Sequence, residues 1–399
     1  MITPDEMQQR VNLARMLLSS GRTSIDDQPL VDEMGVAALP LPEAEPAALL
    51  PIPFPAGLKP VPQPFNPRPA SSDKLPEADV VVVTWTVAEH EALCDVLTPG
   101  FSRLTWPRYD RNFAAKYDAK IRAGAPAKKS RSLGSYVVTK IGNKKVLCFK
   151  SELHLNQDGA KTGDGTATMP VKDLFLQVIE EAKPKAVLTV GTCGGIDVDH
   201  DLGDVLVTRG AKFRLQSEFK NEPFARQAFT SDWALPTTHF AKAEELMAAF
   251  AGNLREPDFG PPTKRYNFIG PLLKAKPNKP SIIHEAGTTP ANTIPAFHPV
   301  LSTDFFEFGT SNNASELLQI GCGLEMGDAA LGLAASELAS PPKWAVIRNI
   351  SDPQINGDLP KGSMALNMQA HWAVWYYEAF GYHTSVNSAL AAWAIIAGL

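Results

Sequence analysis

The chain has 399 residues, of which 44% are hydrophobic and 20% charged, and its formal net charge is −5. These values are typical of a globular protein that is long enough for one or two domains. The negative charge argues against a general polyanion binder, so nucleic acid is not an expected partner. The four cysteines are widely spaced and form no C-x-x-C pair, which argues against a zinc knuckle or a disulfide framework.

The two ends of the sequence indicate in which cellular compartment the protein is expected. The first residues lack the long apolar core of a signal peptide. The C-terminal stretch ALAAWAIIAGL is the most apolar of the chain, but it is too short to span a membrane. We therefore expect a soluble, cytoplasmic protein with no membrane partner.

The first 75 residues differ from the rest. Residues 3–20 are predicted to form a helix, because Thr3 is a good N-cap and Glu6 completes a capping box. Proline then recurs every few residues from 39 to 69, which predicts neither helix nor sheet, and the apolar side chains there favour a strap packed on a surface. We predict an N-terminal helix plus Pro-rich extension over residues 1–75 and a catalytic domain over residues 76–399.

From residue 78 onward, apolar strands alternate with helical patterns. ADVVVVTWT is a continuous β-branched run, typical of a strand buried on both faces. Similar strands are predicted at 145–149, 185–191, 204–208 and 343–350, and helices at 88–97, 171–182 and 323–339. The alternation predicts an α/β fold, a three-layer α/β/α sandwich with a mixed, largely parallel central sheet.

Two regions are irregular. Residues 101–150 carry thirteen Lys or Arg against two Asp, and the run AKKSRSLGS at 127–135 indicates an exposed basic loop. A solvated surface is the simpler interpretation, and a site for a phosphate-bearing ligand is the alternative. Residues 251–300 are rich in Pro, Gly and Asn and predict long surface excursions.

Three strand ends carry candidate site residues, since ligands of α/β sheets collect at the carboxyl ends of strands. VGTCGGIDVDHDLGD follows one strand with a Gly-rich turn that lacks both G-x-G-x-x-G and the Walker lysine. TWTVAEHEAL places Glu89 after another. AVIRNISDPQ brings Arg348 and Asp352 onto one face of a third, either as parts of a site or as a structural ion pair.

Together these strand ends resemble the purine nucleoside phosphorylase and nucleosidase superfamily over roughly residues 78–399. The first strand with TWTVAEHEAL is similar to the opening strand and following glutamate of that family, and the Gly-rich turn to its Gly-Ser/Thr-x-Gly-Gly turn. LSTDFF, GLEMGDAALGLAA and VIRNISDP resemble its Ser-Gly-Asp-x-Phe, Val-Glu-Met-Glu-Ala-Ala and Arg-x-x-Ser-Asp motifs. A nucleoside phosphorylase-like fold and a homo-oligomer, dimer or hexamer, are then expected.

The resemblance implies cleavage of the N-glycosidic bond of a purine nucleoside or nucleotide. Asp352 is then the general acid that protonates the departing base, Arg348 orients the reacting groups, and Glu89 positions a water. The residues expected to bind substrate are Thr192, Gly194, Phe306, Met326, Glu325 and Ser351. No cofactor is implied, and the eight histidines show no metal-ligand spacing.

The reaction could be a hydrolysis, in which water attacks the sugar, or a phosphorolysis, in which inorganic phosphate attacks it. Phosphorylases of this family carry an arginine before the Gly-rich turn, where this chain has Thr189, so hydrolysis is favoured. Phosphorolysis stays open, with Arg209, Lys212 or Arg214 as ligands of inorganic phosphate.

One position departs from the family pattern. Gly327 stands where the family has the glutamate that accepts hydrogen bonds from the ribose hydroxyls. Three explanations are open: Asp328 or Glu325 reaches the sugar, the substrate lacks a free ribose diol, or the protein binds a nucleoside without turning it over.

Overall fold

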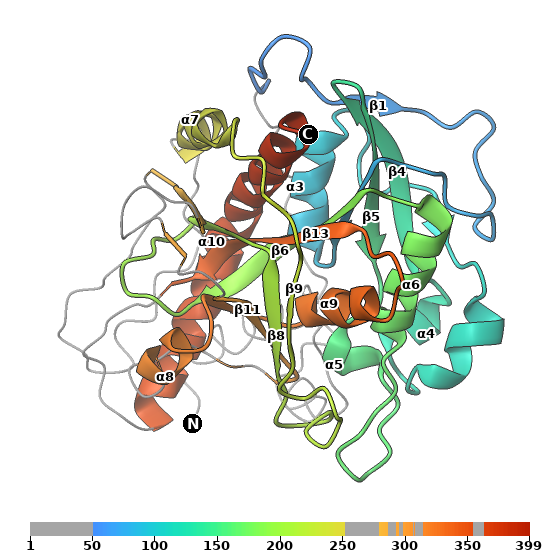
Figure 1. The fold of residues 1–399 in the computed structure, drawn as a ribbon, viewed down its shortest axis with the longest axis vertical. Helices are drawn as coiled ribbons and strands as arrows, with labels where there is room; N and C mark the ends of the chain where they lie inside the picture. The colour runs from blue at the N-terminus through green and yellow to red at the C-terminus, as the bar shows by residue number, and fades with distance from the viewer. Residues whose placement is uncertain are drawn as a thin grey trace, which may run out of the picture.

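A mixed, mostly parallel sheet forms the centre of the fold (Figure 1). The computed structural model describes residues 51–251, 279–285, 293–294, 298–305, 307, 314–353 and 363–399. The predicted helix at 3–20 and most of the predicted excursions after residue 251 lie outside these ranges.

The described part of the sheet has thirteen strands in the order β1-β4-β5-β2-β6-β12-β11-β8-β9, with β13 pairing β6 and β7, β10 pairing β7, and β3 pairing β4. The strands are β1 (Val61–Gln63), β2 (Val80–Thr84), β3 (Arg108–Tyr109), β4 (Gly134–Ile141), β5 (Lys144–Ser151), β6 (Ala186–Gly195), β7 (Val205–Thr208), β8 (Gly210–Arg214), β9 (Ala228–Thr230), β10 (Ile282–His284), β11 (Val300–Thr303), β12 (Gly323–Glu325) and β13 (Lys343–Asp352). The strands β5, β2, β6 and β13 run parallel to one another.

Helices cover both faces of this sheet. The helices are α3 (Val87–Leu97), α4 (Pro126–Ser130), α5 (Leu155–Asp158), α6 (Pro170–Ala182), α7 (Phe240–Ala251), α8 (Ala314–Leu318), α9 (Asp328–Ser336) and α10 (Ser363–Ala397), with a π-helical turn at Phe113–Tyr117 and a 3-10 turn at Asp118–Lys120. Figure 1 shows α10 running beside α3, while α6 and α9 lie together elsewhere on the sheet. The three-layer arrangement is confirmed.

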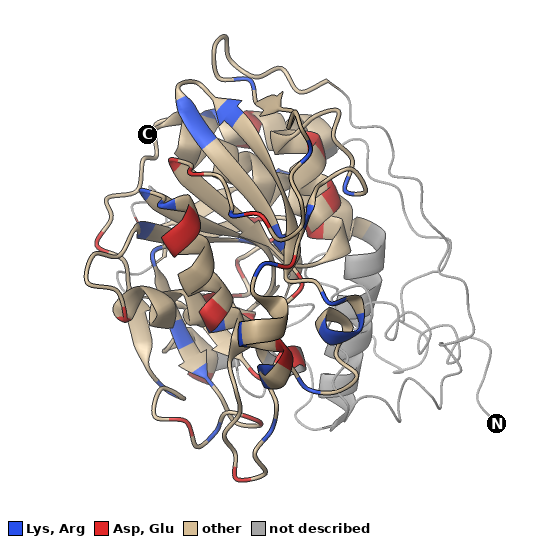
Figure 2. Ribbon diagram, turned by 90° about the vertical axis from the view of Figure 1, so that its right-hand side faces the viewer, with Lys and Arg blue, Asp and Glu red and all other residues tan. Residues whose placement is uncertain are grey.

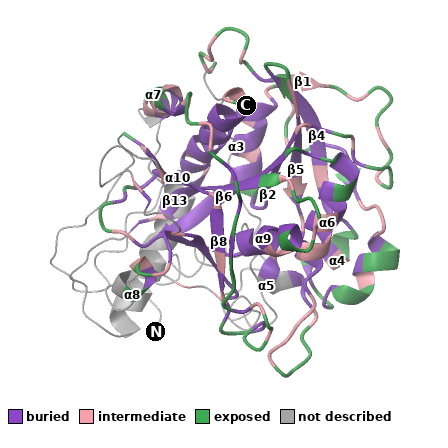
Figure 3. Cartoon of the chain, in the orientation of Figure 1, coloured by how far each residue is buried: buried purple, intermediate pink, exposed green. Residues whose placement is uncertain are grey.

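The run VVVVT of β2 shows why the sequence folds this way. Val80 and Val82 pack into the core under α3, α7 and α10, and Val81 and Val83 pack into the core under α6 and α9. Because successive side chains of a strand point to opposite faces, a strand with a helical layer on each side needs apolar residues at every position. Figure 3 shows the central strands buried and the exposed residues on the outer loops.

The predicted strands at 145–149, 185–191, 204–208 and 343–350 are confirmed, and so are the helices after β2 and at 171–182. The helix predicted over 323–339 is wrong at its start, because Gly323–Glu325 form β12 and α9 begins only at Asp328. The basic run at 127–135 is not a loop, because α4 and the first residues of β4 occupy most of it and Ala127 and Leu133 are buried, but Lys129, Ser130 and Arg131 are exposed as predicted.

Residues 51–75 form the packed strap that the apolar content predicts. Phe54 lies against Trp393, with ring centroids 5.0 Å apart, and the Trp393 indole donates to the Leu58 carbonyl over 2.8 Å. Phe65 lies edge-on to Tyr136 at 5.5 Å. Contrary to the expectation from proline content, three of these residues form β1, which is tolerated because β1 lies at the edge of the sheet beside β4.

Within the described part of the chain, none of the helices combines the length and the apolar character that a membrane crossing requires.

The strap contacts predict that Phe54→Ala lowers the free energy of unfolding by about 1–3 kcal/mol, since a partly buried aromatic side chain leaves its place on Trp393. Urea denaturation of the full chain measures the loss. Lys59→Ala in the same segment removes an exposed side chain and is the matched control, with an expected change within about 0.5 kcal/mol. Equal effects of the two changes would contradict the packed strap.

Candidate functional site

A buried guanidinium lies at the centre of the candidate site. Arg348 is on β13, between β6 and β7, and is 3% exposed. Its Nε donates to Asp328 Oδ2 over 2.7 Å and its Nη2 to Asp328 Oδ1 over 2.5 Å. Burial by itself would lower the pKa of Arg348, but Asp328, Glu325 and Glu89 raise it, so the group stays charged.

Glu89 joins α3 to the Gly-rich turn. It is the N3 residue of a capping box with Thr86, and Oε2 accepts from the backbone of Thr86 and Trp85 and from the Thr84 hydroxyl. Its Oε1 accepts from the backbone N–H of Thr192 over 2.8 Å and from the Thr192 hydroxyl over 3.0 Å. Burial would raise the pKa of Glu89, yet the Arg348 charge and the backbone donors hold it below its ordinary value.

Glu325, at the end of β12, is a third acidic neighbour of Arg348. Its Oε2 lies 3.6 Å from Arg348 Nη2 and accepts from the Asp328 backbone N–H over 2.9 Å, and Oε1 accepts from the Ser302 hydroxyl. Burial and the Asp328 carboxylate raise the pKa of Glu325 to about 8, against the opposing effect of Arg348. This carboxyl group is therefore the one of the cluster that takes up a proton near neutral pH.

At two positions of the turn on β6 only glycine fits, because side chains of neighbouring elements approach the backbone closely. A Cβ on Gly191 would lie 2.3 Å from Arg348 Nη1 and 2.6 Å from Glu89 Oε1. A Cβ on Gly194 would lie 2.9 Å from Asp352 Oδ2. The Gly-rich turn therefore makes room for the acidic and basic side chains of neighbouring elements, which a larger residue would displace.

Asp352 ends β13 at the open side of the cluster. A β-bulge separates it from Ile350, and it lies opposite Gly194 of β6. Its Oδ1 accepts from the Ser351 hydroxyl over 2.9 Å, and the same hydroxyl lies 3.3 Å from the Cys193 carbonyl. Asp352 is partly exposed, whereas Glu89, Glu325 and Asp328 are buried.

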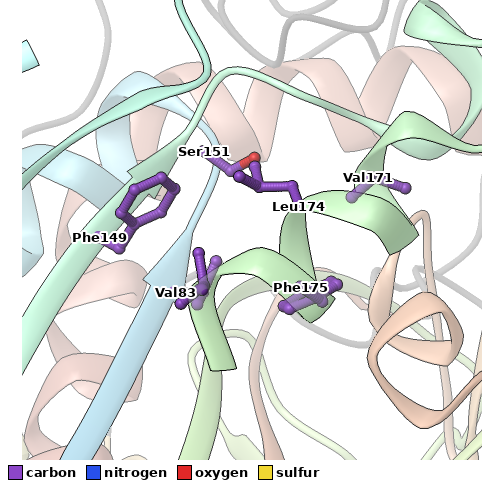
Figure 4. A pocket seen from close by; sticks show the side chains of 7 residues that line it. Val83, Phe149, Ser151, Val171, Leu174 and Phe175 are labelled. Atoms are coloured by element: carbon purple, nitrogen blue, oxygen red, sulfur yellow. The ribbon is translucent and has the colours of Figure 1, made fainter. Parts of the chain in front are cut away.

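Trp85 forms one wall of the cluster. The Arg348 guanidinium lies over its ring, 5.0 Å from the centroid, and the indole N–H donates to the Leu153 carbonyl over 3.0 Å. On its other side the ring meets Phe175 edge-on at 6.2 Å. A small apolar pocket lies beside it between β2, β5 and α6 (Figure 4), lined by Val83, Phe149, Ser151, Val171, Leu174, Phe175 and Val178.

The fold thus gathers almost all the residues that the sequence predicts for the site. The predicted residues that meet here are Glu89, Thr192, Gly194, Glu325, Arg348, Ser351 and Asp352, and Met326 is the buried residue that follows Glu325 in the chain. Phe306 lies outside the described residues. The structural ion pair considered for Arg348 and Asp352 is wrong, because Arg348 donates its bidentate pair to Asp328.

Sequence reasoning missed Trp85 and Ser302 and gave Asp328 only a secondary place. The helix expected over 323–339 runs through Gly327, whereas α9 begins only at Asp328. A helix that begins at Asp328 turns that carboxylate toward Arg348 instead. The signal available in the sequence was the G-D pair itself, since Gly and Asp both favour helix starts.

The basic segment 101–150 does not gather its cations at this site. Arg111 pairs with Glu181, Lys120 with Asp173 and Arg122 with Glu218. Figure 2 shows basic and acidic residues interspersed over the ribbon. Among the residues that the structure describes, no three His, Cys, Asp or Glu side chains lie as metal ligands would.

No protein-family model and no curated protein sequence matches this chain. Its structure is similar to that of a 5′-methylthioadenosine/S-adenosylhomocysteine nucleosidase from Neisseria meningitidis, with a TM-score of 0.44, 14% identity, and coverage of 80% of this chain and 100% of that one. It is also similar to an S-adenosylhomocysteine nucleosidase from Streptococcus pyogenes (TM-score 0.43, 11% identity, 82% and 98% covered). A futalosine hydrolase from Helicobacter pylori gives a TM-score of 0.40 at 12% identity, with 79% and 96% covered.

The raised pKa of Glu325 predicts a pH-dependent stability difference between the wild type and Glu325→Gln. A group whose pKa is higher in the folded state stabilises below its unfolded value, near 4.5, and loses that contribution as pH rises through about 8. The wild type should therefore lose stability relative to Glu325→Gln between pH 5 and pH 8.5, measured by urea midpoints. The other titrating groups are common to both proteins, so parallel pH profiles would contradict a raised pKa.

Proposed function

We propose that this protein is a nucleosidase that hydrolyses the N-glycosidic bond of a purine nucleoside. The observation that carries the proposal is the position of Asp352, the one carboxylate of the four in the cluster that is partly exposed, at the mouth of a buried Arg348 centre. The resemblance of its strand end to the Arg-x-x-Ser-Asp signature gives the same assignment. Seven of the thirteen cations of 101–150 pair with acidic side chains, which leaves fewer of them for a 5′-phosphate and favours a nucleoside over a nucleotide.

Asp352 acts as the general acid. When the C1′–N9 bond breaks, its electron pair goes to the purine, and the Asp352 proton goes to N7 of the departing base. Ser351 fixes the carboxyl group by donating to Oδ1, and the absence of a side chain at Gly194 leaves space beside Oδ2. The sugar left behind has the character of an oxocarbenium ion, which the carboxylates around Arg348 stabilise by charge.

Glu89 acts on the nucleophile through Thr192. The five donors already aimed at Glu89 fill its oxygens, since a carboxylate has about four lone-pair sites. The Thr192 hydroxyl donates to Glu89 and can still accept from a water. That water attacks C1′, and its proton passes through the Thr192 hydroxyl to Glu89, so that water adds across the broken bond.

Hydrolysis is favoured over phosphorolysis by the charges of the cluster. Arg348, the cation of the cluster, is engaged by Asp328, and the buried Asp328 and Glu89 carboxylates would repel a phosphate dianion. Arg209 and Arg214, considered as phosphate ligands, pair with Glu285 and Glu307. The second candidate, a nucleoside-binding protein without turnover, is favoured by Gly327 alone.

The purified protein should release free base from a purine nucleoside without added phosphate, and Asp352→Asn should lower the rate by about 100-fold or more, since the amide cannot donate the proton. Chromatography of base release over a nucleoside panel, with and without phosphate, measures both. Asp173→Asn, a surface carboxylate paired with Lys120, is the control and should keep the wild-type rate. Strict phosphate dependence would move the assignment to a phosphorylase, and tight binding without release would make the protein a binder.

Thr192→Val keeps the shape of the side chain and removes the hydroxyl, so kcat should fall by about 10- to 100-fold. Thr189→Val is the matched control on the same strand, because the Thr189 hydroxyl is buried and has no partner in the described part of the chain. Steady-state kinetics of the two variants measure the difference. Equal kcat values for both would remove Thr192 from the path of the proton.

A further inference from the structure

The three buried carboxylates around Arg348 are all engaged by donors of the protein itself. Both oxygens of Asp328 accept from Arg348. Glu325 accepts from the Ser302 hydroxyl and from the Asp328 backbone N–H, and the Ser302 oxygen in turn accepts from the Ala329 N–H. Five donors fill the oxygens of Glu89, and Asp328 and Glu325 are buried and already bonded within the protein, so a ligand hydroxyl would have to compete with these donors for an acceptor.

Gly327 has no side chain that could accept a hydrogen bond from a ligand in place of these carboxylates. A Cβ built there would lie 3.7 and 3.9 Å from two carbons of the Trp85 ring and 3.9 Å from Glu325 Oε2. Beside Gly327 lie the hydrocarbon of an indole, whose single polar atom is already bonded to the Leu153 carbonyl, and one oxygen of the buried Glu325, which accepts from the Asp328 backbone N–H. Asp328 points away into its bidentate pair with Arg348, so it does not substitute for a side chain at 327.

We propose that the sugar accepted by this site lacks a free 2′,3′-diol, and that a purine 2′-deoxynucleoside is the simplest ligand of this class. The inference rests on the proposed function and names its substrate class. A vicinal diol needs acceptors for two O–H groups, and a carboxylate that receives both is the strongest arrangement. Among the described residues, a 2′-hydroxyl against Trp85 and Gly327 would give up water and meet only acceptors that the protein already uses, whereas a 2′-methylene packs on the ring.

The test is the affinity of matched nucleosides that differ by one hydroxyl. Adenosine and 2′-deoxyadenosine, guanosine and 2′-deoxyguanosine, and 3′-deoxyadenosine are titrated by calorimetry into Asp352→Asn, in which turnover is slow. Affinity is the readout because removal of the electron-withdrawing 2′-hydroxyl eases formation of an oxocarbenium ion in any glycosidase and would raise kcat by itself. The deoxy member of a pair should bind about tenfold or more tightly.

A tighter ribonucleoside in each pair, equal affinities, or no binding of any deoxynucleoside would overturn the inference. Base release by the wild type separates this failure from that of the proposed function. Release of base with a ribonucleoside preference in binding keeps the nucleosidase and removes the substrate class. Selective binding of deoxynucleosides without base release from any of them removes the nucleosidase and keeps the inference about the sugar.

Two substitutions at residue 327 test the cause. Gly327→Glu adds the missing carboxylate, and Gly327→Ala adds only the Cβ, for which the contacts are of ordinary van der Waals length. The ratio of ribonucleoside to deoxynucleoside affinity should rise at least tenfold in Gly327→Glu relative to Gly327→Ala. Equal ratios would overturn the explanation, and the affinities measured with Gly327 in place stand by themselves if Gly327→Glu does not fold.

Discussion

Burial of one positive charge, that of Arg348, is the constraint on which the rest of the site depends. A guanidinium in the middle of a sheet, 3% exposed, is tolerated only if it is paired and hydrogen-bonded. Asp328 supplies a bidentate pair, and Glu325 and Glu89 add charge from two other directions. Burial first, and then the neighbouring Asp328 carboxylate, raise the pKa of Glu325 against the opposing charge of Arg348.

This charge cluster also ties together elements that are far apart in the chain. Glu89 belongs to the first turn of α3, Glu325 ends β12, Asp328 begins α9, and Arg348 lies on β13. Glu89 shows how one side chain serves both local structure and the cluster. It completes the capping box of α3 and also accepts from the Thr192 N–H in the turn of β6. The same contacts that end these strands and start these helices therefore shape the site.

The edge of the sheet has to be covered, whereas the candidate site has to keep an acidic group accessible. The strap of residues 51–75 covers the outer side of β4 and packs on Trp393, which protects an edge strand from pairing with another chain. At the candidate site, by contrast, the carboxylates are buried except for that of Asp352, which is partly exposed. The candidate site therefore combines a partly exposed acid, a buried cluster of paired charges and the ring of Trp85.

The layers of the fold and most residues of the candidate site could be predicted from the amino-acid pattern. Continuous β-branched runs such as that of β2 require helices on both faces, and polar residues at the ends of such strands mark where a ligand can bind, because both signals are local. Glu89, Arg348 and Asp352 were identified in this way, and Thr192 by the resemblance of its turn to a family motif. Which charges meet could not be predicted, because it is a property of the folded chain. Whether Arg348 pairs with Asp352, four residues away, or with Asp328, twenty residues away, depends on a β-bulge and on a helix that starts one residue after Gly327, and neither is written in the periodicity of the sequence.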